Sequence, residues 1–317
     1  MSRCFVTRDL PFTALDRLRA EHEVEVWRDR MPPPRERLVE GARAADGLLC
    51  VLTDLVDSDL LQACPGLRAI SNYAVGVDNV ELAAATGRGI PVGHTPGVLT
   101  GATADLTLAL MLAALRRLSE GEAVVRRGEW ITWEPAFLLG RDLHDAAVLL
   151  IGRGRIGQAV ARRLEGFGAR VVMAGRGDAL EPRLAEADVV SLHCPLTEQT
   201  RGLIGVRELE AMKPTAVLVN TARGPIVDTE ALGRALHDGE IAGAALDVTD
   251  PEPLPADHPL LGAPGLLVLP HLGSATHVTR EAMADLAVDN LLAALGGERM
   301  PHCANPEVYA KPTRRAP

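Results

Sequence analysis

Short apolar runs alternate with helical patterns along almost the whole chain, and this rhythm restricts the fold more than any other feature. A strand, helix, strand order at this spacing is typical of parallel sheets that carry helices on both faces. The expected strands are residues 3–7, 24–27, 47–52, 68–73 and 90–93, and then 147–152, 170–175, 188–194, 216–222, 242–248 and 266–271. The sequence therefore predicts an α/β protein with two doubly wound parallel sheets.

The two groups of strands predict two domains. The stretch 102–118 is apolar nearly all round, so we expect a helix that is buried between two layers and bridges the groups. A last helix at 279–298 is expected to return to the first group, which makes the first domain discontinuous. We expect a substrate domain at residues 1–98 and 284–317, and a dinucleotide-binding domain at residues 99–283.

Two segments lack a clear periodic pattern. The connection 119–145 is expected to be irregular, and it carries Trp130 and Trp133. Exposed tryptophans on a long connection are typical of a subunit contact. Packing of both rings on their own chain is an equally good alternative. The tail 304–317 is expected to be loose.

Composition excludes several classes of protein. The 317 residues are 47% hydrophobic and carry a net charge of −9, which argues against a general nucleic-acid or anionic-membrane binder. No apolar run resembles a signal peptide or reaches membrane-spanning length, so we expect a soluble cytoplasmic protein. The scattered cysteines favour free thiols over disulfides or a metal site. They are Cys4, Cys50, Cys64, Cys194 and Cys303.

A glycine loop follows the first expected strand of the second group. The motif GRGRIG at 152–157 stands between an apolar strand and a helix, which is the context that dinucleotide binding requires. Gly152 permits a tight turn, Gly154 lets the backbone approach a pyrophosphate, and Gly157 lets the helix pack closely on the strand. The helix N-terminus then offers free N–H groups to the anion. The alternative is a merely tight turn.

The next strand ends in an arginine where an NAD enzyme usually has an acid. Gly175 and Arg176 close this strand, and the first acid is Asp178. Arg176 is suited to pair with a 2′-phosphate, and Arg153 and Arg155 add positive charge at the loop. The sequence thus favours NADPH, with NADH possible. In the alternative, Arg176 is a solvated surface residue and Asp178 reaches the ribose.

Three later strands end in residues suited to hydride-transfer chemistry, which needs a cation for the substrate and a proton donor. Arg223 follows the strand at 216–222 between small neighbours, and can grip a carboxylate. His271 ends the strand at 266–271, where a nearby carboxylate would stabilise its charged form. The candidate carboxylates Asp247, Asp250 and Glu252 lie in one turn, and the pattern does not decide which of them partners the histidine. Each residue alone is more often structural.

At these positions the sequence resembles the D-isomer-specific 2-hydroxyacid dehydrogenase family, over nearly the whole chain. The motifs are VGVDNV at 75–80, GRGRIG at 152–157, VNTARGPIVD at 219–228, LDVTDPEPLP at 246–255 and PHLGSAT at 270–276. Within the family the wording is closest to the glyoxylate/hydroxypyruvate reductases. The resemblance implies a Rossmann cofactor domain inserted into a flavodoxin-like substrate domain, and a homodimer formed through the cofactor domain.

The resemblance also implies a role for each matching residue. Arg223 is expected to hold the substrate carboxylate, His271 to act as general acid, and Glu252 to be the acid that pairs with it. Val75 and Gly76 are expected to bind the substrate carboxylate through their amides. The expected cofactor contacts are Thr103, Gly152, Gly154, Arg155, Ile156, Gly157, Gly175, Arg176, Cys194, Pro195, Thr221, Asp247 and Gly273.

The expected activity is reduction of glyoxylate, hydroxypyruvate or a similar 2-oxo acid by NADPH to the D-2-hydroxy acid. One alternative is another enzyme of the family, such as a phosphoglycerate or phosphonate dehydrogenase. A formate dehydrogenase is disfavoured, because those enzymes carry a glutamine where Glu252 stands. The other alternative is a nucleotide-sensing protein that resembles the family's corepressors.

Overall fold

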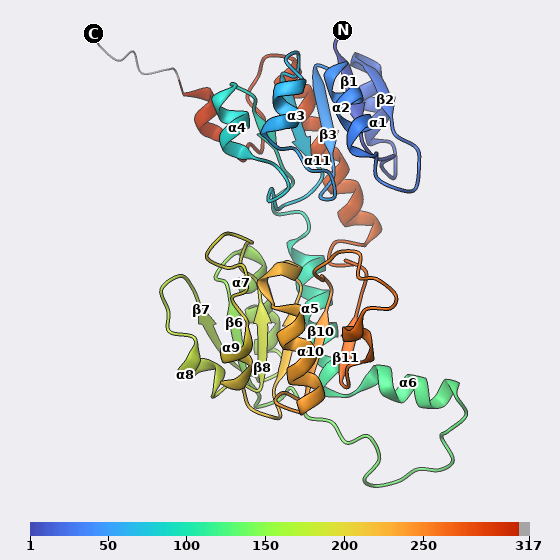
Figure 1. The fold of residues 1–317 in the computed structure, drawn as a ribbon, viewed down its shortest axis with the longest axis vertical. Coiled ribbons are helices and arrows are strands. Elements are labelled where there is room, and N and C mark those ends of the chain that lie inside the picture. The colour runs from blue at the N-terminus through green and yellow to red at the C-terminus, as the bar shows by residue number, and fades with distance from the viewer. Residues whose placement is uncertain (311–317) are drawn as a thin grey trace. The chain divides into compact units, whose positions relative to one another are not determined.

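The computed structural model describes residues 1–310, which form two compact α/β units (Figure 1). Unit 1 contains Met1–Leu99 and the chain from Thr276 onward, and unit 2 is Thr100–Ala275. The second boundary lies at Thr276 rather than at residue 284. The reason is local: the Thr276 hydroxyl caps the last helix by accepting from the Thr279 amide, so the whole helix belongs to one body.

Unit 1 is built on a five-stranded parallel sheet with the order β2-β1-β3-β4-β5, which is the flavodoxin-like order. Its strands are β1 (Arg3–Val6), β2 (Glu23–Val26), β3 (Gly47–Cys50), β4 (Ala69–Asn72) and β5 (Val92–Gly93). Its helices are α1 (Ala14–Glu21), α2 (Arg35–Arg43), α3 (Ser58–Ala63), α4 (Leu82–Gly87) and α11 (His277–Leu295), with a 3-10 turn η3 (Pro306–Tyr309).

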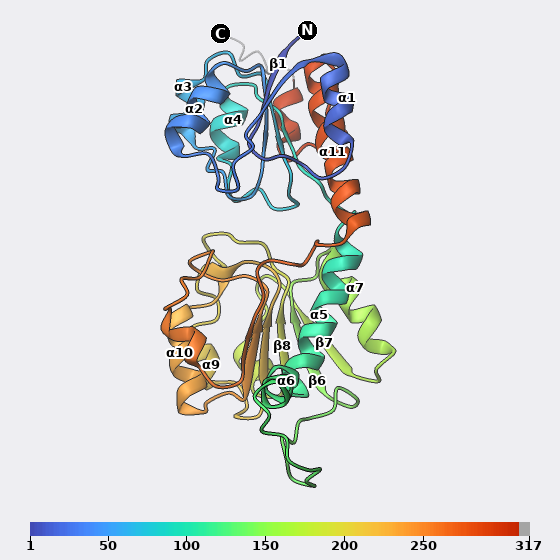
Figure 2. The same cartoon turned by 90° about the vertical axis from the view of Figure 1, so that its right-hand side faces the viewer.

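Both faces of this sheet are covered, so its central strands are buried. Helices α2, α3 and α4 lie on one face, and α1 and α11 lie on the other (Figure 2). Every residue of β3 and β4 is buried. Helix α11 packs closely, because a Cβ at Gly47 would lie 3.0 Å from Leu291. The burial fits a parallel sheet that is covered on both faces, as the sequence predicted.

Unit 2 is built on a six-stranded parallel sheet with the order β11-β10-β9-β8-β6-β7. Its strands are β6 (Ala147–Ile151), β7 (Arg170–Ala174), β8 (Val189–Leu192), β9 (Val217–Asn220), β10 (Gly243–Leu246) and β11 (Leu266–Val268). Its helices are α5 (Thr100–Leu115), α6 (Leu118–Arg126), α7 (Arg155–Glu165), α8 (Glu181–Leu184), α9 (Val206–Glu210) and α10 (Thr229–Asp238), with 3-10 turns η1 (Gly224–Ile226) and η2 (Pro259–Gly262).

The strand order in this sheet changes direction at β6, which has β7 on one side and β8 on the other. Ligands of open α/β sheets bind outside the carboxyl ends of the strands at such a switch point. A usual Rossmann sheet has a further strand outside β7. Here residues 175–188 contain only α8, so β7 is the edge strand.

The predicted irregular connection is wrong in its first part. Residues Leu118–Arg126 form helix α6, separated from α5 by Arg117 in the left-handed region at φ 53°. The helix predicted at 102–118 is α5, which ends at Leu115, because the chain turns at Arg117 before α6 begins. Trp130 and Trp133 are 61% and 77% exposed, which excludes the alternative that both rings pack on their own chain.

The predicted loose tail is wrong as far as residue 310. The Ala304 amide donates to the Val92 carbonyl, and Asn305 accepts from the Val92 amide and donates to the Ile90 carbonyl. These bonds fix the segment on the edge strand β5. Residues 311–317 of that prediction lie outside the described part of the chain. Within the described part, no helix combines the length and the apolarity that crossing a bilayer demands.

Candidate active site

The glycine loop connects β6 to α7 at the switch point of unit 2. Gly152 has φ 122°, and a Cβ on it would lie 2.5 Å from the backbone of His193. A Cβ on Gly157 would lie 2.2 Å from the Gly152 carbonyl oxygen. Only glycine fits at either position, so the loop after β6 can pack directly against the backbone at the end of β8. Gly154 faces open space on the other side.

Helix α7 presents an unblocked N-terminus to that open space. It begins at Arg155 after Gly154, no side chain caps it, and no acidic residue lies in its first turn. The first N–H groups and the positive end of the helix dipole are therefore available to an anion. A dinucleotide pyrophosphate fits this loop, with Ile156 half-buried behind it.

Charged side chains meet at the carboxyl end of β7. One Asp178 oxygen accepts from the Gly175 amide at 2.8 Å and from Arg153 at 2.7 Å. The other oxygen lies 3.3 Å from the Arg183 guanidinium. The Gly175 amide and both arginines hold the pKa of Asp178 below its usual range. Arg176 is exposed and makes no hydrogen bond or ion pair with any residue between 1 and 310.

The residues that follow β8 pack against the glycine loop after β6. Cys194 and Pro195 follow His193 there, and Cys194 is half-buried. The Nε2 atom of His193 lies 2.9 Å from the Ser191 hydroxyl, while its Nδ1 is buried without a partner among the described residues. Burial lowers the pKa of His193 to about 4, so this ring is neutral at physiological pH.

The Arg223 loop follows β9 and is braced by a buried asparagine. The Asn220 side chain donates to the Arg223 carbonyl at 2.8 Å and accepts from the Ala222 amide at 3.0 Å. The Arg223 guanidinium donates to the Ala222 carbonyl at 2.8 Å. A Cβ on Gly224 would lie 1.9 Å from the Thr249 carbonyl oxygen, so this loop packs directly on the loop after β10.

The loops after β10 and β11 join His271 to Glu252. The Nδ1 of His271 lies 2.7 Å from the Glu252 carboxylate, and both side chains are only partly exposed. Glu252 also accepts from the Thr249 amide at 3.4 Å. Because a carboxylate only accepts, the Nδ1 of His271 donates, and Nε2 is the nitrogen left to exchange a proton.

Asp247 holds the turn that carries His271. Its carbonyl accepts from the His271 amide at 2.9 Å, and its carboxylate accepts from the amides of Leu272 at 2.6 Å and Gly273 at 2.8 Å. His271 itself adopts a left-handed conformation at φ 57°. Burial raises the pKa of Asp247, and the two amide bonds oppose that shift. Of the three acids that the sequence pattern left as alternatives, Glu252 therefore binds the His271 ring, and Asp247 binds the backbone amides of the same turn.

One further expected cofactor position, Thr103, lies on α5, and two others, Thr221 and Gly273, lie on the loops that this helix contacts. The Thr103 hydroxyl donates to the Gly273 carbonyl at 3.2 Å, and Thr107 lies 3.0 Å from the Thr221 hydroxyl. All three threonines are buried. This hydroxyl network ties helix α5 to the loops after β9 and β11.

Val75 and Gly76 belong to unit 1, in the loop after β4. Their carbonyls are engaged by side chains, since His94 Nδ1 lies 2.9 Å from the Val75 oxygen and Asn72 donates to the Gly76 oxygen at 2.9 Å. Neither amide has an acceptor in the part of the chain that the structure describes. Two adjacent unpaired amides suit a carboxylate.

Sequence reasoning missed three residues of this arrangement. Asn220 braces the Arg223 loop, His193 lies beneath the glycine loop, and Arg183 reaches Asp178 from α8. A polar residue at the end of an otherwise apolar strand was a usable signal for Asn220 and His193. No local signal marked Arg183, because its position depends on the short connection after β7.

A dinucleotide loop at the switch point of a Rossmann-like sheet, with a histidine–carboxylate pair and an arginine at its later strand ends, defines a nicotinamide-dependent oxidoreductase. The comparisons narrow this class. The family described as "D-isomer specific 2-hydroxyacid dehydrogenase, NAD binding domain" matches residues 108–273. The chain belongs to the D-isomer-specific 2-hydroxyacid dehydrogenase family and is an NAD(P)-dependent enzyme.

Individual relatives match over nearly the full length. The glyoxylate reductase of Korarchaeum cryptofilum is 44% identical over 320 residues, which cover 96% of each chain. The TT0316 protein of Thermus thermophilus is similar in structure, with a TM-score of 0.90, 52% identity, and coverage of 95% of this chain and 99% of that one. The NADPH-dependent glyoxylate/hydroxypyruvate reductase of Sinorhizobium meliloti, solved with NADP and malonate, gives a TM-score of 0.82, 35% identity, and coverage of 95% and 96%.

Proposed function

We propose that the protein reduces glyoxylate, hydroxypyruvate or a similar small 2-oxo acid to the D-2-hydroxy acid, with NADPH as the preferred reductant. The observation that carries the proposal is the 2.7 Å bond between His271 Nδ1 and Glu252, at a strand end next to the Arg223 loop. This is the pair that carbonyl reduction needs for its proton. The names of the full-length relatives support the substrate class.

The bound nicotinamide cofactor supplies the hydride, and the protein supplies the proton and the charge. Protonated His271 donates from Nε2 to the oxygen of the reacting carbonyl. Glu252 fixes the ring through Nδ1 and stabilises its charged form. Arg223 holds the substrate carboxylate and stabilises the negative charge that develops on the oxygen. The amides of Val75 and Gly76 are proposed as further donors to the carboxylate.

The glycine loop and its surroundings are proposed to hold the cofactor. Gly152, Gly154 and the amides of Arg155, Ile156 and Gly157 would receive the pyrophosphate. Cys194, which is half-buried, and Pro195, which is exposed, would line the adenosine side. Thr103, Thr221, Asp247 and Gly273 would line the nicotinamide side.

The charges at the end of β7 support NADPH over NADH. Asp178 is the acid that could bind the ribose hydroxyls, but both of its oxygens are already engaged by Gly175, Arg153 and Arg183. Arg176 is exposed beside them and is available to a 2′-phosphate through charge-assisted hydrogen bonds. We therefore assign Arg176 to phosphate recognition and Asp178 to support of the loop.

We further propose that the protein acts in the cytoplasm as a homodimer. Its five cysteines are free thiols, which favours a reducing compartment. The exposed tryptophans of unit 2 support self-association.

The test of the function is a cofactor-crossed assay. Glyoxylate and hydroxypyruvate are each offered with NADPH and with NADH, and loss of cofactor absorbance is followed. We expect turnover with a strong preference for NADPH. Turnover with NADH preferred would refute the role of Arg176. Cofactor binding without turnover of either acid would refute these two substrates, and would favour another 2-oxo acid or a nucleotide-sensing protein.

A further inference from the structure

The carboxylate of a 2-oxo acid needs N–H donors, and the loop after β4 offers two of them side by side. The amides of Val75 and Gly76 have no acceptor among the described residues. Successive backbone N–H groups bind an anion when they point to the same place. Whatever fixes the direction of these two amides is therefore part of the site.

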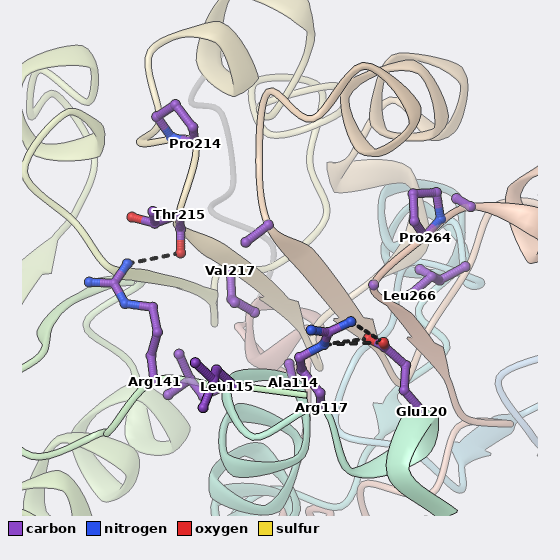
Figure 3. A pocket seen from close by; sticks show the side chains of 15 residues that line it. Ala114, Leu115, Arg117, Glu120, Arg141, Pro214, Thr215, Val217, Pro264 and Leu266 are labelled. Atoms are coloured by element: carbon purple, nitrogen blue, oxygen red, sulfur yellow. Dashed lines mark hydrogen bonds and ion pairs between the residues drawn. The ribbon is translucent and has the colours of Figure 1, made fainter. Parts of the chain in front are cut away.

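A pocket in unit 2 is not an alternative place for this carboxylate (Figure 3). It has a volume of about 600 Å³ and opens at the amino ends of β9, β10 and β11. The candidate catalytic residues follow the carboxyl ends of these strands, at the opposite edge of the sheet. The arginines of the pocket are also engaged, since Arg117 pairs with Glu120 and Arg141 donates to the Thr215 carbonyl.

The direction of each amide is tied to a carbonyl. A peptide group is planar and trans, so its N–H and its C=O point in opposite directions. The Val75 amide shares its plane with the Ala74 carbonyl, and the Gly76 amide shares its plane with the Val75 carbonyl. The partners of these two carbonyls therefore decide where the two amides point.

Those partners come from consecutive residues after β5. The Thr95 amide donates to the Ala74 carbonyl at 2.9 Å, so the backbone alone directs the Val75 amide. The Nδ1 of His94 lies 2.9 Å from the Val75 oxygen, and because a carbonyl only accepts, this nitrogen donates. The direction of the Gly76 amide thus depends on a side chain. A peptide group beside a glycine also rotates readily, because glycine tolerates most backbone conformations.

The main chain of His94 is held without the help of its ring. Its amide donates to the His302 carbonyl at 3.1 Å, and its carbonyl accepts from the Asn290 side chain at 2.9 Å. Asn290 lies on α11, is fully buried, and also accepts from the His302 amide at 2.9 Å. Loss of the His94 ring should therefore leave the end of β5 in place and release only the Val75 carbonyl.

We propose that His94 is a positioning residue for the substrate carboxylate, an inference that rests on the proposed function. Its Nδ1–H group holds the Val75 carbonyl, and this bond keeps the Gly76 amide aimed at the carboxylate. In this role His94 acts through Gly76 and not on the reacting atoms. Its loss therefore weakens binding of the acid in the ground state and in the transition state alike, which raises KM and leaves kcat unchanged.

Two substitutions separate the donor from the bulk of the ring. Asparagine carries its Nδ2 as many bonds from the backbone as histidine carries Nδ1, so His94→Asn keeps the donor and loses bulk. His94→Leu keeps much of the bulk and loses the donor. We expect His94→Leu to raise KM for the 2-oxo acid about tenfold with kcat within about twofold of the wild type, and His94→Asn to stay within about threefold in KM. Tenfold is less than the full loss of a hydrogen bond to a charged group, since the amide is loosened and not removed.

The matched control is His302→Leu. His302 is half-buried like His94, and its ring makes no hydrogen bond or ion pair with any residue from 1 to 310. Its main-chain bonds to His94 and Asn290 do not need the ring, so KM and kcat should stay at the wild-type values. Circular dichroism and thermal unfolding should show the same fold for all three variants.

A binding measurement separates this inference from the reaction itself. Oxamate has the carboxylate and the neighbouring carbonyl of a 2-oxo acid, but its carbonyl belongs to an amide and resists reduction. Its affinity is measured by calorimetry with the protein saturated with NADPH. We expect His94→Leu to bind oxamate about tenfold more weakly than the wild type, and to bind NADPH equally well, because the glycine loop lies in unit 2.

Each outcome has one meaning. An unchanged KM and oxamate affinity in His94→Leu would overturn the positioning role, and so would an equal loss in His94→Asn or a fall in kcat that matches the rise in KM. Oxamate binding that is weakened in His94→Leu and restored in His94→Asn, without turnover of either acid, would refute the proposed reaction and leave the role of His94 standing. A wild type that binds no oxamate would overturn the carboxylate site and the role of His94 with it.

Discussion

Arg176→Ala is expected to weaken NADPH binding about 30-fold and to leave NADH binding within about threefold of the wild type. The structure sets this magnitude. Arg176 is exposed, so its interaction with a phosphate is screened by solvent and lies well below that of a buried pair. A charge-assisted hydrogen bond contributes about 1.5–3 kcal/mol. Taking about 2 kcal/mol for this exposed site, and about 1.4 kcal/mol for each tenfold in affinity, gives the stated factor.

The other arginines nearby cannot readily replace it. Arg153 and Arg183 are both bound to Asp178, and moving either guanidinium to a phosphate would leave that carboxylate with one partner fewer. The assay is titration of the purified protein with NADPH and with NADH, followed by quenching of tryptophan fluorescence or by calorimetry. Arg170→Ala is the matched control, since Arg170 lies at the opposite end of β7. An equal loss for both cofactors, or no loss, would refute phosphate recognition by Arg176.

His271→Ala should lower kcat by about 100-fold or more, which is the usual scale for loss of a general acid; steady-state kinetics with a near-normal rate would refute the assignment. Arg223→Ala should raise KM strongly and lower kcat as well, and an unchanged KM for the 2-oxo acid would remove its carboxylate role. His193→Gln tests whether this histidine makes the free energy of unfolding depend on pH. The pKa of His193 is about 4 in the folded protein and near 6.5 in the unfolded chain, so the wild type loses stability as pH falls through this window. Urea unfolding at about pH 7 and about pH 4.5 should show a loss larger by about 2–3 kcal/mol in the wild type than in the variant, whereas equal losses would contradict a buried neutral ring.

The sequence was a sound guide to the elements that depend on local pattern. Every strand expected from the apolar runs is present, because strands covered on both faces of a parallel sheet carry mostly apolar residues. The glycine loop could also be predicted from the sequence. Gly152 lies so close to the His193 backbone that no side chain fits, and this requirement is visible in the sequence as a glycine. Helix α6 was not predicted, and none of its nine residues is buried in the structure.

The residues of the candidate site also include some that the sequence pattern predicted and some that it did not. Arg223 and His271 were visible as polar residues at strand ends, where an α/β sheet exposes its chemistry. The choice among Asp247, Asp250 and Glu252 was not visible in the residue pattern and came from the family resemblance. The structure gives the reason: the turn after β10 sends Glu252 to the ring of His271, while Asp247 faces the amides of the same turn.

By itself, the sequence determined the two parallel sheets, the phosphate loop and the residue types available for catalysis. The sheets follow from the local periodicity of apolar residues, and the loop follows from glycines at positions where no side chain fits. Only the tertiary structure decided the strand order, the edge position of β7 and the partners of Asp178. Those depend on which segments pack together. The Arg153–Asp178 pair joins residues from two different strand ends, and the short link through α8 brings in Arg183. Contacts of this kind form only when the sheet has brought distant residues side by side, and no local pattern encodes them.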